Sequence, residues 1–188
     1  VVERFDRLQS GEKLGIEDFA TLLGRSGDDK YKGSYENILK ATWLNTESLT
    51  EVEKAFKLIA FNCLIGNGDA HLKNFSLIYD KHLTNIRLSP VYDVTHTLVY
   101  ANIDKNMALK MRKSRTFPTR QQLIDFAYDA GVPRANAAAA IDEIADNLNA
   151  CLNSLAEIEA MPGLKDSMAK HLTASMHQTH LKLSLIHI

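Results

Sequence analysis

A stretch from Ile65 to Asp80, IGNGDAHLKNFSLIYD, places an aspartate, a histidine, a lysine and an asparagine within six residues. A carboxylate such as Asp69 can accept the proton of an attacking hydroxyl, and the amide oxygen of Asn74 is a ligand that suits Mg²⁺. Asp93 follows in LSPVYDVTHT and would supply a second hard oxygen. Together these residue types suit the transfer of a phosphoryl group to a hydroxyl.

The spacing of Asp69 and Asn74, D-x-x-x-x-N, is that of the catalytic loop in protein kinases. The spacing alone is weak support, because aspartate and asparagine are common in loops for turn reasons. It gains weight from its surroundings, which are a helix end, a strand, a turn, a second strand and then Asp93. Far fewer proteins have that order of elements and residues than have the D-x-x-x-x-N spacing alone.

Two predicted elements must position these residues. Apolar side chains recur at helical spacing from Val52 to Leu64, and Gly66 ends that helix. The segments 75–79, FSLIY, and 85–89, NIRLS, predict a β-hairpin around a polar turn. The polar residues therefore fall where a packed helix ends and a hairpin begins, which is a rigid platform for chemistry.

The hairpin also predicts a distance. Asn74 precedes its outgoing strand and Asp93 follows its return strand, and paired strands lie about 5 Å apart. A shared Mg²⁺ at about 2.1 Å from each oxygen needs the two side chains within roughly 4–6 Å of each other. Asp69 is expected on the same side, slightly farther away, because it serves the hydroxyl and not the metal.

The remaining segments predict one domain that is mainly α-helical. We expect a strand over 1–8, a short helix over 15–24, and a helix from Ser34. A capping box, Ser48 with Glu51 or Thr50 with Glu53, predicts the start of the helix that precedes the polar loop. Three further helices are predicted, one from Thr119 through Ala130, a long one from Pro133, and a last one from about Leu164.

Composition excludes several classes of protein. The 188 residues carry 22 basic and 23 acidic side chains, a net charge of −1, which argues against direct binding of nucleic acid or a membrane surface. There is no apolar run of membrane-spanning length and no signal peptide, so we expect a cytoplasmic protein. Cys63 and Cys151 both sit in apolar helical patterns and are predicted to be buried free thiols.

Two sequence motifs carry a resemblance to a known family. LIGNGDAHLKNFSLIYD followed by LSPVYDVTHT resembles the C-terminal lobe of the HipA serine/threonine kinases, the toxins of HipA–HipB toxin–antitoxin modules. The family pattern is Leu-Ile-Gly, then Asp-x-His-x-Lys-Asn-Phe, then Pro-x-Tyr-Asp, and every part is present. The opening VERFDR is also similar to the family's hinge strand. The resemblance implies a kinase-like C-terminal lobe, mainly α with a small β-hairpin.

The resemblance implies roles for individual residues. Asp69 is similar to the catalytic aspartate, and Asn74 and Asp93 match the pair that binds Mg²⁺. Lys73 matches a catalytic-loop position and could offset charge on the transferring phosphoryl group. His71 matches another, and we favour a structural role in which it ties the loop by hydrogen bonds.

The same resemblance implies that residues at the start of the chain contact ATP. Glu3 and Phe5 match hinge positions whose main-chain groups meet the adenine, so the site is expected to border Phe5. A kinase also needs an N-lobe lysine and a loop over the phosphates, and neither G-x-G-x-x-G nor V-A-I-K occurs here. We therefore expect that an N-lobe is missing and that this chain alone transfers no phosphate.

Both ends of the chain look unnatural. It begins VVERFDR without an initiator Met, and it ends LSLIHI, which is similar to a translated sequencing adapter. We expect a kinase C-terminal domain over 1–182, with 1–7 as the hinge strand, and a non-native tail over 183–188. The gene is expected to be cut at both ends.

The implied partners are a HipB-like helix-turn-helix antitoxin and a protein substrate, an aminoacyl-tRNA synthetase in some members of the family. Two alternatives stay open. One is a phosphotransferase for sugars or aminoglycosides, whose loop is similar. The other is a kinase-derived lobe that only binds. Outside the motifs, His171, His177 and His180 are expected on the surface, and the basic cluster Arg112–Arg115 is expected to be solvated.

Overall fold

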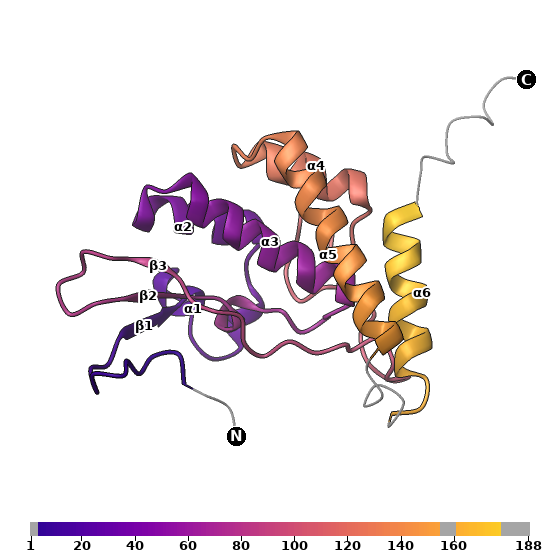
Figure 1. Ribbon diagram of the computed structural model, residues 1–188, viewed down its shortest axis with the longest axis horizontal. Helices are drawn as coiled ribbons and strands as arrows, with labels where there is room; N and C mark the ends of the chain where they lie inside the picture. Colours follow the sequence, from indigo (N-terminus) through magenta and orange to yellow (C-terminus); the bar gives the residue numbers. More distant parts are fainter. Residues whose placement is uncertain (1–3, 155–160, 178–188) are drawn as a thin grey trace, which may run out of the picture.

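The computed structural model describes residues 4–154 and 161–177. Figure 1 shows a small sheet at one end and helices that extend from it across the molecule. In chain order the elements are β1 (Gly15–Asp18), α1 (Phe19–Leu22), the 3-10 helix η1 (Gly27–Tyr31), α2 (Tyr35–Thr46), α3 (Leu49–Ile65), the 3-10 helix η2 (Leu72–Asn74), β2 (Ser76–Tyr79), β3 (Arg87–Leu88), α4 (Arg120–Asp129), α5 (Arg134–Ser154) and α6 (Leu164–His177).

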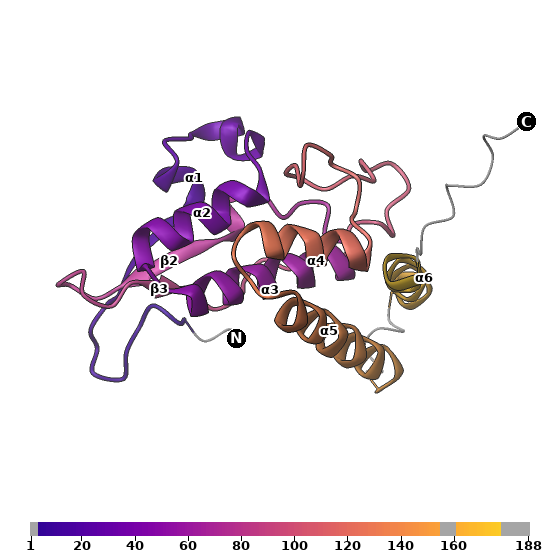
Figure 2. The same cartoon turned by 90° about the horizontal axis from the view of Figure 1, so that it is seen from above.

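The sheet is antiparallel in the order β1-β2-β3, with Ile16 opposite Ile78 and Leu77 opposite Leu88. Helices α2 and α3 lie side by side next to it (Figures 1 and 2). The predicted hairpin is confirmed as β2 and β3, and the fold class is confirmed as mainly helical. Burial of large side chains such as Phe56 and Phe75 joins the helices to the sheet in one core.

Local sequence signals set the helix ends. The side chains of Ser34, Ser48 and Thr119 accept hydrogen bonds from backbone N–H groups in the first turns of α2, α3 and α4. These caps satisfy donors that a helix leaves unpaired at its start. Gly66 ends α3 at φ 75°, a left-handed conformation that glycine adopts without a Cβ penalty. The predicted starts of these helices are confirmed.

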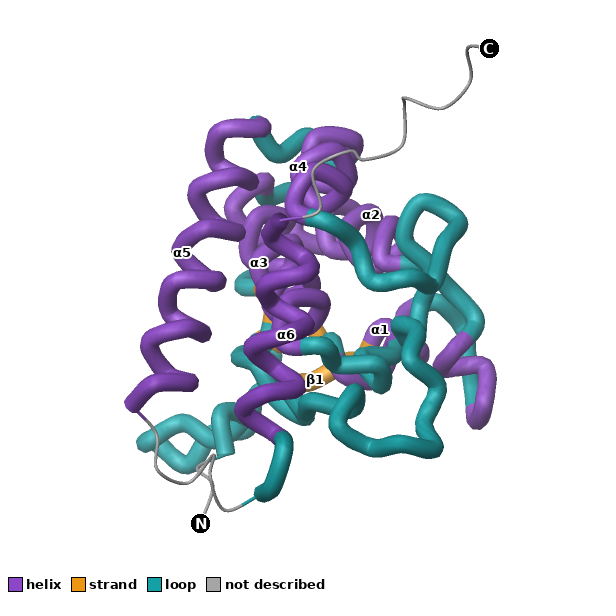
Figure 3. Tube along the Cα trace, turned by 90° about the vertical axis from the view of Figure 1, so that its right-hand side faces the viewer, coloured by secondary structure: helices purple, strands orange, loops and turns teal. Residues whose placement is uncertain are grey.

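The second half of the chain is a helical layer around α3. Arg120 on α4 donates to both carboxylate oxygens of Asp142 on α5, at 2.8 and 2.7 Å. Helix α6 lies against α3 and α5, as Figure 3 shows from the side. The long helix predicted from Pro133 is confirmed as α5, whose first turn includes a bond from Ala137 N–H to the Pro133 carbonyl.

Two predicted elements are wrong. The described part of the predicted strand 1–8 forms turns, and its one bridge joins Arg7 to Lys13, because the chain reverses within a few residues. The predicted helix over 15–24 is instead β1 followed by the single turn α1. Its first four residues pair with β2, and the Asp18 side chain then caps α1. Tertiary pairing outweighs local propensity here.

Some expectations fall outside the described residues, namely Glu3, His180 and the tail 183–188. The prediction for the cysteines is half wrong. Cys63 is buried, but Cys151 is exposed because it faces away from the core side of α5. Within 4–154 and 161–177, none of the helices has the length and hydropathy that a membrane span requires.

Candidate active site

Asparagine side chains hold the loop that follows α3. The Asn67 amide donates to the Asn62 side-chain oxygen at 2.7 Å, and the Asn67 side-chain oxygen accepts from the Asp69 backbone N–H at 3.0 Å. Both asparagines are buried. A buried, satisfied polar network rigidifies the backbone around it. Asp69 therefore stands in a fixed loop just after α3 and is itself exposed.

The segment 96–106 packs directly against this loop. Thr97 Oγ1 accepts a hydrogen bond from the Gly68 N–H at 2.9 Å. A Cβ atom at Gly68 would lie 2.7 Å from that oxygen and 2.9 Å from the Asn106 carbonyl oxygen. Glycine at position 68 is thus needed so that the loop can approach Thr97 and Asn106 closely. A larger residue would displace the segment that supports Asp69.

Asn74 and Asp93 meet across the base of the hairpin, as the sequence predicts. The Asn74 side-chain amide donates to Asp93 Oδ2, and Asn74 Oδ1 accepts from the His71 backbone N–H at 2.8 Å. Asn74 is buried, whereas Asp93 is exposed. Asp93 has φ 55°, a left-handed backbone that is uncommon for a residue with a side chain. Strained backbone of this kind concentrates at functional sites.

A tyrosine next to Asp93 fixes this geometry. The Tyr92 hydroxyl donates to the Lys73 carbonyl at 2.8 Å and accepts from the Ser76 hydroxyl at 2.5 Å. The Phe5 ring stacks on Tyr92 with centroids 5.9 Å apart. Phe5 therefore borders the site, as expected. Tyr92 was visible as part of the PVYD motif, but nothing in the sequence alone indicated its bond to the loop.

The candidate base Asp69 has a partner that sequence reasoning missed. The Tyr31 hydroxyl donates to Asp69 Oδ1 at 3.0 Å, although 38 residues separate the two. Burial, and then the bond to Asp69, raise the pKa of Tyr31. No periodicity or spacing rule connects an η1 residue with the loop after α3. Lys73, which lies in η2 directly after this loop, is exposed.

His71 is buried near both carboxylates, Asp69 and Asp93. Asp69 and Asp93 both act on its charge, but burial dominates and lowers the pKa of the imidazole, with Lys30 adding to the effect. Its ring meets the Tyr31 ring edge-on, with centroids 5.1 Å apart. Nδ1 has no hydrogen-bond partner in the part of the chain that the structure describes. The loop is tied at this residue by the backbone N–H of His71, which bonds both Asp69 O and Asn74 Oδ1 at 2.8 Å.

The donor set at Asn74 and Asp93 fits Mg²⁺ brought in with a nucleotide. Mg²⁺ takes one or two protein oxygens and completes its shell with phosphates and water. Among the described residues no group of three or more His, Cys, Asp or Glu could hold a metal. Ligation by Asn74 requires its amide oxygen to turn toward Asp93. The His71 N–H would then keep Asp69 O as its acceptor.

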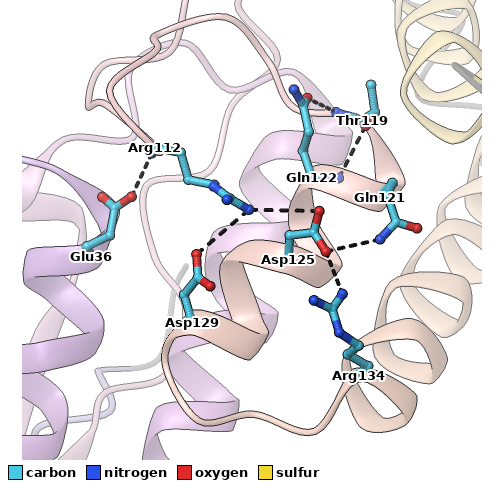
Figure 4. A network of polar contacts seen from close by, with 8 residues as sticks. All are labelled: Glu36, Arg112, Thr119, Gln121, Gln122, Asp125, Asp129 and Arg134. Carbon is cyan, nitrogen blue, oxygen red and sulfur yellow. Dashed lines mark hydrogen bonds and ion pairs between the residues drawn. The ribbon is translucent and has the colours of Figure 1, made fainter. Parts of the chain in front are cut away.

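The basic cluster Arg112–Arg115 is not simply solvated, which corrects the expectation. Figure 4 shows the Arg112 guanidinium between Asp125 and Asp129 of α4, at 3.8 and 3.7 Å. The Arg112 backbone N–H also donates to Glu36 of α2 at 2.6 Å. This turn therefore joins α2 to α4 and has a structural role.

Two histidines bond backbone carbonyls in the last turn of α3. His171, expected on the surface, is half-buried, and its Nε2 bonds the Cys63 carbonyl at 2.8 Å. His96 is buried and bridges the Ile65 carbonyl, at 2.5 Å, and the Ser167 hydroxyl of α6, at 2.8 Å. Burial lowers the pKa of both imidazoles. His177 is exposed, as expected.

The fold and site together define a helical lobe whose hairpin brings an Asp–Asn–Asp set to one helix end. The chain belongs to the family of HipA-like C-terminal domains, whose profile matches residues 1–152. This confirms the family resemblance that the sequence motifs indicated.

Two relatives come from Sinorhizobium fredii and are named as predicted kinases. Y4dM is 40% identical over 115 residues, which cover 61% of this chain and 27% of Y4dM. Y4mE is 31% identical over 143 residues, covering 70% of this chain and 34% of Y4mE. The chain thus spans about a third of the length of these relatives.

A solved structure shares the fold. It is the Shewanella oneidensis toxin–antitoxin system of HipA, HipB and operator DNA, with a TM-score of 0.71 and 21% identity. The match covers 91% of this chain and 45% of the other.

Proposed function

We propose that this chain is the C-terminal lobe of an ATP-dependent serine/threonine protein kinase, the toxin of a toxin–antitoxin module. The observation that supports it best is the contact between Asn74 and Asp93 at one end of the hairpin, with Asp69 bonded to the same His71 N–H through its carbonyl. Kinase chemistry needs an acidic base beside a pair of oxygen ligands. The relatives named as kinases agree with this class.

Each residue has a distinct task in this proposal. Asp69 accepts the proton of the acceptor hydroxyl, because it is exposed in a fixed loop just after α3. Asn74 and Asp93 hold Mg²⁺, which neutralises charge on the phosphates when bound. Lys73 stabilises negative charge on the transferring group. Phe5 lies beside Tyr92 and marks the side where adenine rests.

His71 is assigned a structural task. Burial disfavours its charged form, so its imidazole is a poor counter-ion for phosphate at neutral pH. Its backbone N–H instead links Asp69 to Asn74. We therefore place it among the residues that position the loop.

The family resemblance suggests the class of substrate and the partner. We propose a protein Ser/Thr acceptor and a HipB-like antitoxin in a cytoplasmic setting, because the structurally similar HipA was solved with HipB. The nucleotide clamp is assigned to a segment beyond this chain, which spans 27% and 34% of its kinase relatives.

The test uses the full-length gene product with labelled ATP and Mg²⁺. Asp69→Asn keeps the shape of the side chain and removes the base, so phosphate transfer should fall about 10²- to 10⁴-fold. Asp146→Asn, an exposed change on α5, should leave the rate unchanged. Equal rates for Asp69→Asn and wild type would refute the assignment.

The product decides between the alternatives. Phosphoserine or phosphothreonine on a protein supports the proposal. Phosphorylated sugar or aminoglycoside would establish the small-molecule alternative, and nucleotide binding without any product would establish a binding lobe. This chain alone should give no labelled product, because its sequence contains neither G-x-G-x-x-G nor V-A-I-K, the motifs that contact the phosphates in kinases.

A further inference from the structure

Tyr31 occupies a position that an acceptor hydroxyl needs. A general base must lie within about 2.6–3.2 Å of the oxygen whose proton it takes. The Tyr31 hydroxyl already stands 3.0 Å from Asp69 Oδ1 and donates its proton to that oxygen. A second donor aimed at the same oxygen competes with the tyrosine for it.

The Tyr31 ring is held by few contacts. It rests edge-on against His71, Lys30 Nζ lies 4.9 Å from its centroid, and the residue is 43% exposed. The η1 turn that carries it, Gly27–Tyr31, contains no buried residue, and its N-cap Ser26 makes no side-chain cap bond. Segments with little buried surface and exposed hydrogen bonds open at low free-energy cost. This turn can therefore leave Asp69 without disturbing the core.

The backbone that carries Asp69, in contrast, is held by several contacts. Its backbone N–H is fixed by buried Asn67, and the adjoining Gly68 is pressed against Thr97. Between Asp69 and Tyr31, the tyrosine is thus the partner that can move. Another hydroxyl can therefore replace that of Tyr31 as the hydrogen-bond donor to Asp69 while the carboxylate stays in place.

We propose that Tyr31 is a gating residue of the acceptor site. Its hydroxyl occupies Asp69 in the absence of substrate and is displaced by the incoming protein hydroxyl. Until then it keeps water from being activated and ATP from being hydrolysed without transfer. This inference rests on the proposed function and adds the residue that favours a protein hydroxyl over water.

The reaction that the gate suppresses is ATP hydrolysis. In it, a water oxygen bonds to the γ-phosphorus while the bond from that phosphorus to the bridging oxygen breaks. ADP leaves, and the water proton passes to Asp69 and then to solvent. We take Oδ1 of Asp69, the oxygen to which the Tyr31 hydroxyl donates, to be the acceptor of that water proton.

The experiment measures ADP release by the full-length protein with ATP and Mg²⁺ but no protein acceptor. Tyr31→Phe keeps the ring and removes the hydroxyl, so ADP release should rise about 3- to 10-fold, the factor that one ordinary hydrogen bond represents. Tyr128→Phe, an exposed tyrosine on α4 that stacks under Arg134, is the matched control and should change nothing.

A second readout needs neither nucleotide nor activity. Thermal unfolding of this chain is compared for Tyr31→Phe, Asp69→Asn and the double variant. Coupled partners give a double variant whose Tm loss is smaller than the sum of the two single losses. Additive Tm losses would show that the two side chains do not interact, and would overturn the proposal.

The outcomes separate this inference from the proposed function. If Asp69→Asn abolishes ADP release while Tyr31→Phe leaves it unchanged or lowers it, the gate is wrong and the kinase assignment stands. If Asp69→Asn changes nothing, the proposed function itself fails. Phosphate found on Tyr31 would also overturn the gate, because the tyrosine would then be an acceptor.

Discussion

Glu51 on the first turn of α3 ties the hairpin to the helix layer. The residue is 8% exposed. Oε2 accepts from the Leu88 backbone N–H at 2.8 Å, and Oε1 accepts from Lys54 Nζ at 2.7 Å. Leu88 lies in β3, and the chain beyond it leads to Asp93. We predict that Glu51→Ala weakens both the fold and the return strand that presents this ligand.

The magnitude follows from the two contacts. Removing the acceptor leaves the Leu88 N–H unpaired in a partly buried place, which costs about 1–3 kcal/mol. The Lys54 ammonium is 55% exposed, so its ion pair contributes about 0–1 kcal/mol. The lost hydrogen bond from the Leu88 N–H therefore accounts for most of the expected loss of stability. For a chain of this size the sum, about 1–4 kcal/mol, lowers Tm by about 2–16 °C.

The assay is thermal unfolding of three variants at pH 7. Glu51→Gln retains an oxygen for Leu88 and should cost less than about 1 kcal/mol. Lys54→Ala removes only the exposed ion pair and should also have a small effect. If Lys54→Ala destabilises the chain as much as Glu51→Ala, or if Glu51→Gln does, the reasoning is refuted.

Three further predictions concern other parts of the structure. Burial lowers the pKa of His96 and His171, so at acidic pH the unfolded chain binds more protons than the folded chain. The free energy of unfolding should therefore fall as pH drops below about 6.5, the ordinary pKa of histidine. Thermal melts from pH 8 to 5 with no loss of Tm would contradict this. Because Asp93 has φ 55°, Asp93→Gly should be about 1 kcal/mol more stable than Asp93→Ala in urea unfolding, the reverse of the usual order within helices and strands. Burial raises the pKa of the Cys63 thiol while Cys151 is exposed, so iodoacetamide should label Cys151 alone in the folded chain, and equal labelling of both would be the contrary result.

Much of the site could be predicted because its parts are close in the sequence. The end of α3, the loop with Asp69 and the hairpin are consecutive, and a hairpin necessarily returns the chain beside its own start. The meeting of Asn74 with Asp93 therefore needed only the two strand assignments. Helix caps were readable for the same reason, since a cap residue bonds within its own first turn.

Periodicity, spacing and capping patterns did not predict contacts between segments that are distant in the sequence. Glu51 was interpreted as part of a capping box, yet its carboxylate bonds β3, 37 residues away. Cys151 shares the apolar pattern of α5, but only packing against neighbouring helices decides which face is covered. Periodicity shows that a helix has two faces and does not show how wide the buried one is.

The sequence by itself determined the helix ends, the hairpin and the three polar residues at its base, because local hydrogen bonds and a single strand reversal produce them. Tertiary structure alone decided that Gly15–Asp18 is a strand and that Tyr31 bonds Asp69. A short edge strand depends on the partner that supplies its hydrogen bonds, and that partner lies some 60 residues along the chain in β2. The Tyr31 contact likewise exists only after α2 and α3 bring η1 and the loop after α3 together.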